Sequence, residues 1–187
     1  MQKSDLEIDD SRFIKAPLTF ISAGRLVPIK NFDKIPTIAK VLKNAGCKFK
    51  WYLLGPSSDF KYTDDIIHGI KTQGVDDCVV WLGNKENPYP YMKNSDVYLC
   101  LSESEACPMV FCESFTLGVP VVTTSFGSSF EFIESGKNGI QSDLDRYSDT
   151  LMNLCFDGKK ILSMKEYLRN YKSFNEASIE SIHQLLN

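Results

Sequence analysis

Residues 96–125 read DVYLCLSESEACPMVFCESFTLGVPVVTTS, and this stretch decides the fold class. It opens with an apolar run of strand length at 96–102 and closes with a second one at 119–125. Between them, the apolar segment from Met109 to Leu117 is predicted to form a helix that Gly118 ends. A strand, a helix and a second strand in this order are typical of a crossover unit, which joins two parallel strands of one sheet.

The same alternation continues on both sides of this stretch. Further strands are predicted at 18–24, 48–55, 78–83 and 138–142, and further helices at 32–43, 59–73, 88–94 and 128–135. From residue 143 onward the pattern is helical, with breaks near Gly158 and Ser173. Strands that are apolar on both faces are expected where helices cover both sides of a sheet. The sequence therefore predicts an α/β fold, with a Rossmann-like parallel sheet flanked by helices.

The composition fits one ordinary globular domain. The chain has 187 residues, of which 43% are apolar and 24% are charged. Its net charge of −3 argues weakly against a surface that coats nucleic acid or binds an anionic membrane. A small basic pocket for one phosphate group is compatible with that charge.

Cysteine and histidine usage disfavours a metal site. The six cysteines contain no C-x-x-C pair, and we expect them to be buried, reduced thiols of a cytoplasmic protein. Only two histidines are present, so zinc ligation is disfavoured. No segment is long and apolar enough to span a membrane, and the acidic first ten residues are unlike a signal peptide. We therefore expect a soluble, cytoplasmic chain without a metal.

Ligands of parallel sheets bind beyond the carboxyl ends of the strands, so the loops at those ends are the candidate sites. The first such loop reads GRLVPIKN at 24–31, which places Arg25 directly after a strand and Lys30 shortly before a helix. Two cations at this edge can hold an anionic ligand, the arginine as a fork and the lysine as a point charge. From these residues alone, two solvated surface cations are the alternative.

The loop within residues 96–125 carries the second candidate. Pro108 suits a first helical position, and we expect the backbone N–H groups of residues 109–111 to be free and aimed at the cleft as an anion site. Glu105 lies just before this helix and Glu113 lies on it, where both carboxylates could accept hydrogen bonds from ligand hydroxyls. The alternative is that Glu105 caps the helix and Glu113 points into solvent.

In this order and spacing, the motifs resemble the donor-binding half of retaining GT-B glycosyltransferases of the GT4 type, the glycosyltransferase group 1 family. The resemblance rests on Gly-Arg-Leu at 24–26 with Lys30 shortly after, on Glu105 and Glu113 with seven residues between them, and on the following Gly-Val-Pro-Val-Val at 118–122. It runs from about Leu18 to the final helix. It implies one half of a GT-B fold, in a glycosyltransferase that serves polysaccharide biosynthesis.

The resemblance also implies a role for each matched residue. Arg25 and Lys30 would hold the donor diphosphate and stabilise the charge that grows on it as the sugar leaves. Glu105, the third catalytic candidate, would bind sugar hydroxyls, and Glu113 would bind the ribose. The other implied donor-binding residues are Gly24, Gly55, Asn84, Ala106, Cys107, Pro108, Met109 and Val110.

The family pattern implies no metal and no cofactor, because the UDP- or GDP-linked sugar is itself the substrate. Two positions depart from the pattern of many relatives, which carry glycine where this chain has Ala106 and an aromatic or other residue where it has Cys107. Both positions lie where the sugar is bound, so they bear on which sugar the donor carries.

A GT-B enzyme has two domains with the active site between them, and this chain is long enough for one. We expect residues 1–16 to be the remnant of an interdomain linker, and 17–187 to be the donor-binding domain with its C-terminal helices. The last stretch, SFNEASIESIHQLL at 173–186, resembles the helix that crosses back to the other domain. The acceptor would be held by an N-terminal domain of the same enzyme or by a partner chain.

Without that second part, we expect the chain to bind the nucleotide-sugar but not to transfer sugar. The resemblance allows the full enzyme to associate peripherally with a membrane at its inner face. The alternatives are a non-catalytic nucleotide-binding subunit and a GT-B relative such as a nucleotide-sugar epimerase. A Rossmann dehydrogenase is disfavoured because no G-x-G-x-x-G follows the first strand.

Overall fold

A computed structural model describes residue 8, residues 10–14 and residues 16–171. The predicted helix break near Ser173 and the predicted closing helix at 173–186 lie outside the described residues. None of the helices in the described part of the chain has the length and apolar character needed to cross a lipid bilayer.

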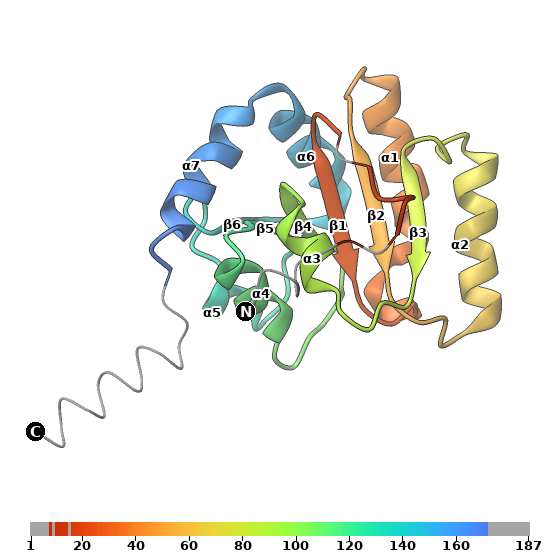
Figure 1. Cartoon of the computed structure of the whole chain (residues 1–187), viewed down its shortest axis with the longest axis horizontal. Coiled ribbons are helices and arrows are strands. Elements are labelled where there is room, and N and C mark those ends of the chain that lie inside the picture. The colour runs from red at the N-terminus through yellow and green to blue at the C-terminus, as the bar shows by residue number, and fades with distance from the viewer. Residues whose placement is uncertain (1–7, 9, 15, 172–187) are drawn as a thin grey trace, which may run out of the picture.

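Six strands form a single sheet in the order β3-β2-β1-β4-β5-β6, and every neighbouring pair is parallel (Figure 1). The strands are β1 (Thr19–Ala23), β2 (Lys50–Leu54), β3 (Val79–Gly83), β4 (Val97–Cys100), β5 (Val121–Thr124) and β6 (Gly139–Ser142). This is the strand order of dinucleotide-binding Rossmann folds, so the predicted fold class is confirmed. The order reverses between β1 and β4, and the carboxyl ends of these two strands are therefore the expected ligand crevice.

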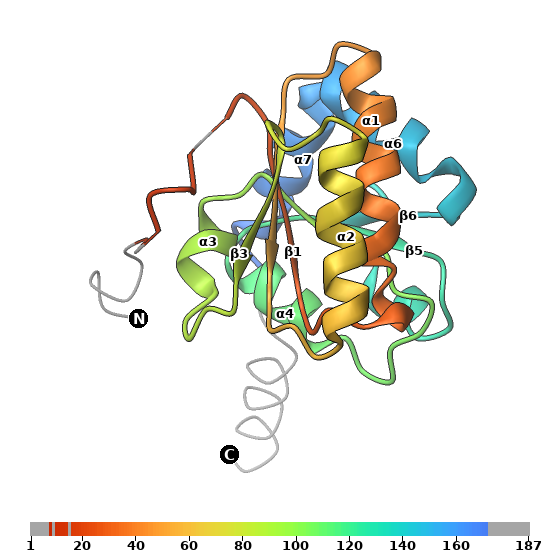
Figure 2. The same cartoon turned by 90° about the vertical axis from the view of Figure 1, so that its right-hand side faces the viewer.

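Helices cover both faces of the sheet, as Figure 2 shows edge-on. The α-helices are α1 (Ile35–Asn44), α2 (Phe60–Thr72), α3 (Tyr89–Lys93), α4 (Met109–Thr116), α5 (Ser129–Phe132), α6 (Tyr147–Phe156) and α7 (Gly158–Leu168). Within the described residues, short 3-10 helices are η2 (Pro28–Lys30), η3 (Phe32–Lys34) and η4 (Leu144–Arg146). Helices α1, α2 and α6 lie on one face, and α3 and α4 lie on the other.

Alternating residues of the central strands build the two halves of the core. Phe20 of β1 and its register partner Trp51 of β2 pack beneath α1, α2 and α6. The next pair in register, Ile21 and Tyr52, packs beneath α3 and α4. All four side chains are fully buried, which explains why these strands read as apolar on both faces. Strand β3 lies at the sheet edge, and there Val80 and Trp81 are only half-buried.

Two sequence predictions need correction. Helix α5 is shorter than the predicted 128–135, because the Asn138 side chain bonds the backbone there, accepting from Glu134 N–H at 2.8 Å and donating to the Phe132 carbonyl at 2.8 Å. The expectation of six buried thiols holds for three of them. Cys47, Cys78 and Cys100 are buried, Cys112 and Cys155 are half-buried, and Cys107 is exposed in the loop before α4.

The segment that precedes β1 packs against the domain. The Phe13 ring lies 4.4 Å from the Tyr52 ring and 5.4 Å from the Tyr91 ring, centroid to centroid. The Tyr52 hydroxyl accepts a hydrogen bond from Ile14 N–H at 2.7 Å and donates one to the Ile14 carbonyl at 2.8 Å. Residues 10–14 thus contact the α3 face of the sheet, whereas the role of residues 1–16 as an interdomain linker stays a prediction.

Candidate functional site

Glycines lie at the carboxyl ends of the first three strands. Gly24 N–H donates to the Leu54 carbonyl and Gly55 N–H donates to the Gly83 carbonyl, both at 2.9 Å. Gly55 has a φ of +137°, and a Cβ atom there would lie 1.8 Å from the Gly24 carbonyl oxygen. Only glycine allows these two segments of the chain to approach this closely. The glycines at the strand ends form a low edge, called the glycine rim below, which leaves open space beyond the strands.

An open pocket of about 270 Å³ occupies that space. It is lined by Ala23, Gly24, Arg25, Leu54, Gly55, Pro56, Asn84, Lys85 and Pro88. A smaller pocket of about 20 Å³ is lined by residues from β1, β4 and the loops after them, and it includes Lys30, Glu105 and Val110. Both pockets share Ala23, the last residue of β1, so they adjoin where the strand order reverses.

Lys30 and Glu105 meet in the smaller pocket. The Lys30 ammonium donates a hydrogen bond to Glu105 Oε1, and the Ser102 hydroxyl donates to the same oxygen at 2.6 Å. The Lys30 and Glu105 side chains are 24% and 18% exposed, so solvent only partly screens their attraction. The Ser128 hydroxyl also donates to the Glu105 carbonyl at 2.6 Å and thereby fixes the loop. Glu105 does not cap α4, because its carboxylate bonds Lys30 and Ser102, and none of the described side chains accepts a hydrogen bond from that helix end.

Glu113 lies on the first turns of α4 and is half-buried. The Tyr89 hydroxyl, from the start of α3, donates to Glu113 Oε1 at 3.2 Å. The neighbouring Glu113 charge, together with partial burial, raises the pKa of Tyr89. The alternative reading, in which Glu113 simply points into solvent, is therefore wrong.

The start of α4 differs from its prediction. Met109 N–H donates to the Cys107 carbonyl and Phe111 N–H donates to the Pro108 carbonyl, both at 2.8 Å. Two of the three N–H groups predicted to be free are thus bonded within the tight turn that opens the helix. Ala106, Cys107 and Met109 are exposed in this turn, and Pro108 is buried.

Arg25 lies apart from Lys30, on the wall of the larger pocket. Its side chain is exposed and has no hydrogen-bond or ion-pair partner among the described residues. The first loop therefore places one cation in each pocket, with Lys30 held by Glu105 and Arg25 open to an incoming ligand.

This order of motifs is shared with a known family. Residues 4–171 match the family described as Glycosyl transferases group 1. The chain belongs to this family. The group 1 relationship predicted from the motifs is thereby confirmed.

Curated proteins related to this group 1 chain are biosynthetic. N-acetyl-alpha-D-glucosaminyl L-malate synthase of Bacillus anthracis is 27% identical over 173 residues, which cover 86% of this chain and 44% of that protein. The lipopolysaccharide core biosynthesis glycosyltransferase LpsE of Rhizobium meliloti is 29% identical over 125 residues, covering 66% of this chain and 34% of that protein. The chain thus spans less than half the length of these relatives.

Solved structures share the fold of this group 1 domain. Anabaena HepE, crystallised with UDP and glucose, superposes with a TM-score of 0.73 at 20% identity, over 90% of this chain and 48% of HepE. The C-terminal domain of the glycosyl transferase group 1 protein LpcC of Francisella tularensis superposes with a TM-score of 0.72 at 20% identity, over 81% of this chain and 82% of that structure.

Sequence reasoning missed the side chains that hold the group 1 carboxylates. Ser102 and Ser128 bond Glu105, and Tyr89 bonds Glu113, yet no motif in the sequence marks these three. Ser128 and Tyr89 lie 23 and 24 residues from their partners along the chain, so only the folded arrangement reveals these two contacts, whereas Ser102 lies three residues before Glu105. Within the described part of the chain, no cluster of three or more His, Cys, Asp or Glu residues could hold a metal ion.

Proposed function

We propose that this chain binds the nucleotide-sugar donor of a retaining glycosyltransferase whose acceptor is held by another domain or chain. The observation that carries the proposal is the meeting of Lys30 and Glu105 beside the Arg25 pocket, with Glu113 on the adjoining helix. Cations and hydroxyl-binding carboxylates together suit a ligand that is both a diphosphate and a sugar. Membership of the group 1 family supports this reading.

The proposed donor lies across both pockets. Arg25 and Lys30 bind the diphosphate, Glu105 accepts hydrogen bonds from sugar hydroxyls, and Glu113 accepts them from the ribose. The larger pocket, with Gly55 and Asn84 on its wall, then receives the nucleotide. The UDP found with HepE, a protein of the same fold, is consistent with a nucleoside diphosphate in this place.

In the proposed reaction the bond between the sugar and the diphosphate breaks, and negative charge grows on the departing phosphate. Arg25 and Lys30 stabilise that charge because they are already positioned at the pocket edge. The contacts from Lys30 and Ser102 hold the Glu105 carboxylate at the edge of the smaller pocket, where it can accept hydrogen bonds from the sugar. The acceptor oxygen then bonds to the same face of the sugar that the diphosphate left, which is the retaining outcome, and the acceptor proton passes to the departing diphosphate.

The full enzyme is proposed to act in the cytoplasm on cell-surface polysaccharide, associated peripherally with the membrane. Relatives named for lipopolysaccharide core and amylovoran biosynthesis support the polysaccharide part of this proposal. Ala106 and Cys107, which are exposed in the loop beside Glu105, are proposed to contact the sugar.

Titration calorimetry of the chain with UDP and with GDP tests the proposal. We expect saturable binding of one of them by a folded sample, without sugar transfer by the chain alone. If a folded sample takes up neither nucleotide, the proposed donor site is wrong.

A further inference from the structure

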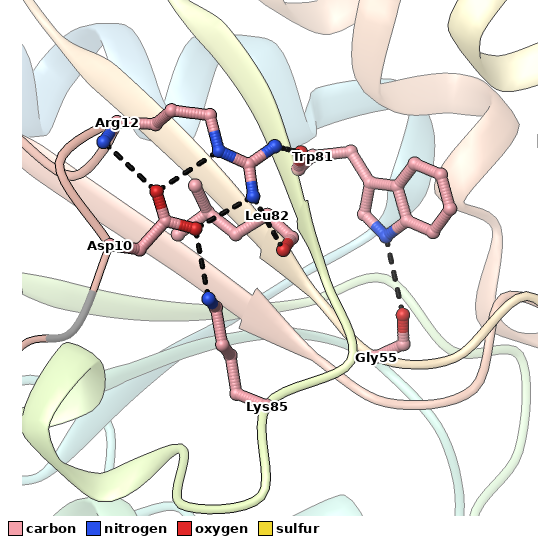
Figure 3. A network of polar contacts seen from close by, with 6 residues as sticks. All are labelled: Asp10, Arg12, Gly55, Trp81, Leu82 and Lys85. Atoms are coloured by element: carbon pink, nitrogen blue, oxygen red, sulfur yellow. Dashed lines mark hydrogen bonds and ion pairs between the residues drawn. The ribbon is translucent and has the colours of Figure 1, made fainter.

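Asp10 lies at the centre of a polar network (Figure 3), and two members of that network, Lys85 and Gly55, line the larger pocket. Its carboxylate accepts hydrogen bonds from Arg12 Nε at 3.0 Å and from Arg12 Nη2 at 2.6 Å, which is fork geometry. The Lys85 ammonium donates to the same carboxylate at 2.9 Å. The Asp10 and Lys85 side chains are only 9% and 14% exposed, so this pair is much better shielded than an ordinary surface ion pair.

The network attaches the segment before β1 to the end of the edge strand. Arg12 Nη1 donates to the Trp81 carbonyl at 3.1 Å, and Arg12 Nη2 donates to the Leu82 carbonyl at 2.9 Å. Trp81 in turn donates from its indole nitrogen to the Gly55 carbonyl at 3.2 Å, at the rim of the pocket (Figure 3). One continuous set of contacts therefore runs from Asp10 to the glycine rim.

Lys85 belongs to a connection that has no secondary structure of its own. Residues 84–88 join β3 to α3, and Asn84, Lys85 and Pro88 all line the larger pocket. The Lys85 ammonium also lies 5.4 Å from the centre of the Tyr91 ring, a cation–π contact. A loop without backbone ladders depends on such side-chain contacts for its position.

We infer that Asp10 is a positioning residue of the donor site, because it holds Lys85 and with it the loop at 84–88 that forms one wall of the nucleotide pocket. The inference rests on the proposed function for the identity of the ligand. Without Asp10, Lys85 would lose this buried ion pair and the loop would be held less firmly, so nucleotide binding would have to order the loop, which weakens affinity. The segment before the sheet is thereby part of the donor site.

The loss of the Asp10 charge and the loss of its positioning role predict opposite effects of Asp10→Asn on nucleotide affinity. Removing a carboxylate beside the cations Arg12 and Lys85 makes the pocket wall more positive, which by itself would favour an anionic nucleotide. Weaker binding by this variant therefore indicates lost positioning. Lys85→Met keeps most of the side-chain stem but removes the ammonium that Asp10 binds, so it tests the same contact from the other side.

The test compares the affinity for UDP, or for GDP if wild type selects it, by titration calorimetry. Asp10→Asn and Lys85→Met should each weaken binding about fivefold. The double variant should bind as well as the single variant with the lower affinity, because the two substitutions remove the same contact. Asp77→Asn is the matched control. It removes a carboxylate that accepts a 2.7 Å bond from Lys43 near the opposite end of β3, and it should bind like wild type. Unchanged or tighter binding by Asp10→Asn, or additive losses, would overturn the inference.

Amide hydrogen exchange without nucleotide provides the second readout. Exchange at residues 84–88 should accelerate in Asp10→Asn and in Lys85→Met, and should stay at the wild-type rate in Asp77→Asn. If wild type binds neither nucleotide, the proposed function fails, whereas this exchange result still decides whether Asp10 positions the loop. If Asp10→Asn does not fold, Lys85→Met alone carries both measurements, and wild-type exchange and affinity in that variant would refute the inference.

Discussion

Lys30 and Glu105 contact each other directly, yet we assign them to different parts of the donor. Lys30→Met should weaken UDP binding by about 1–3 kcal/mol, since it removes a charge-assisted contact to the diphosphate. Arg25→Ala should weaken UDP binding by a similar free energy. Glu105→Gln should leave UDP affinity unchanged or slightly higher, because it removes a negative charge from beside the phosphates. Titration calorimetry of the three variants measures these differences.

A matched control for Lys30 lies four residues along the chain. Lys34 forms an ion pair with Asp33 at 2.8 Å and is 51% exposed, so Lys34→Met should not alter UDP affinity. A panel of UDP-sugars completes the test, because Glu105→Gln should remove any preference for the UDP-sugar over UDP. Equal losses in Lys30→Met and Lys34→Met would assign Lys30 to general surface charge.

Tyr89 should support Glu113 in binding the ribose. Tyr89→Phe removes the hydroxyl that donates to the Glu113 carboxylate but keeps the ring. We expect UDP affinity to fall by about 0.5–1.5 kcal/mol, the usual net worth of one hydrogen bond. The 2′,3′-dideoxy analogue of UDP lacks the ribose hydroxyls, so its affinity should be the same for wild type and the variant. A loss of affinity that is equal for both nucleotides would contradict this role.

The sequence predicted charged candidates better than their partners. Arg25, Lys30 and Glu105 could be predicted because each lies in a loop directly after a strand, and such loops share one edge of a parallel sheet. Tyr89 and Ser128 could not be predicted as partners of the two glutamates. Their contacts depend on how α3 and α5 pack, which local sequence does not determine.

At the scale of an element, the turn after β2 depends on glycine. Gly55→Ala would place a Cβ atom 1.8 Å from the Gly24 carbonyl oxygen at a φ of +137°, so the ends of β1 and β2 would have to separate. We expect the free energy of unfolding in urea to fall by about 2–3 kcal/mol, and nucleotide affinity to fall with it.

Gly46 is the control for Gly55, because alanine at Gly46 would suffer the strain of a positive φ without any steric clash. Its φ is +85°, but a Cβ atom there would meet nothing within 4 Å. Gly46→Ala should therefore cost only about 1 kcal/mol and leave nucleotide binding intact. If both variants lose the same stability, close approach at the glycine rim is not the reason for Gly55.

The strands and long helices were predictable because their apolar periodicity agrees with the final packing. Helix α2, for example, begins after Asp59, whose carboxylate accepts from Tyr62 N–H at 3.0 Å as an N-cap. Residues 10–14 show no such periodicity, and their packing through Phe13 and Arg12 arises from single tertiary contacts. The length of α5 was mispredicted for the same reason, because one asparagine side chain competes for its backbone.

For the whole molecule, the alternation of strands and helices predicted a parallel sheet but not the order of its strands. That order decides which loops become neighbours, and here it brings the loops after β1 and β4 together. The adjoining pockets are thus a property of topology, although the residues that line them come from recognisable loops. Since the chain spans less than half of its curated relatives, the acceptor side of the site stays a proposal.

Stability of the whole domain should decline in acid because carboxylates at both ends of β3 are paired. The hydrogen bond from Arg12 holds the pKa of Asp10 well below its usual range, and the hydrogen bond from Lys43 lowers the pKa of Asp77. A carboxyl whose pKa is lower in the folded than in the unfolded chain adds stability above its unfolded pKa of about 3.9, and loses it as the pH falls through the folded pKa. The free energy of unfolding in urea should therefore fall from about pH 5 downward.

The Asp10→Asn variant isolates the contribution of Asp10 to this pH dependence of stability. The gap in the free energy of unfolding between wild type and this variant should be widest near neutral pH and should narrow below about pH 4, as the Asp10 carboxylate of the unfolded wild-type chain becomes protonated. The matching gap for Asp77→Asn should be smaller at every pH, because that side chain is 64% exposed and solvent screens its pair with Lys43. Urea is used as the denaturant because it is uncharged and so adds no ionic screening to these pairs. A wild-type-to-Asp10→Asn gap that stays constant from pH 7 to about pH 2 would mean that Asp10 is not held ionised by Arg12 and Lys85.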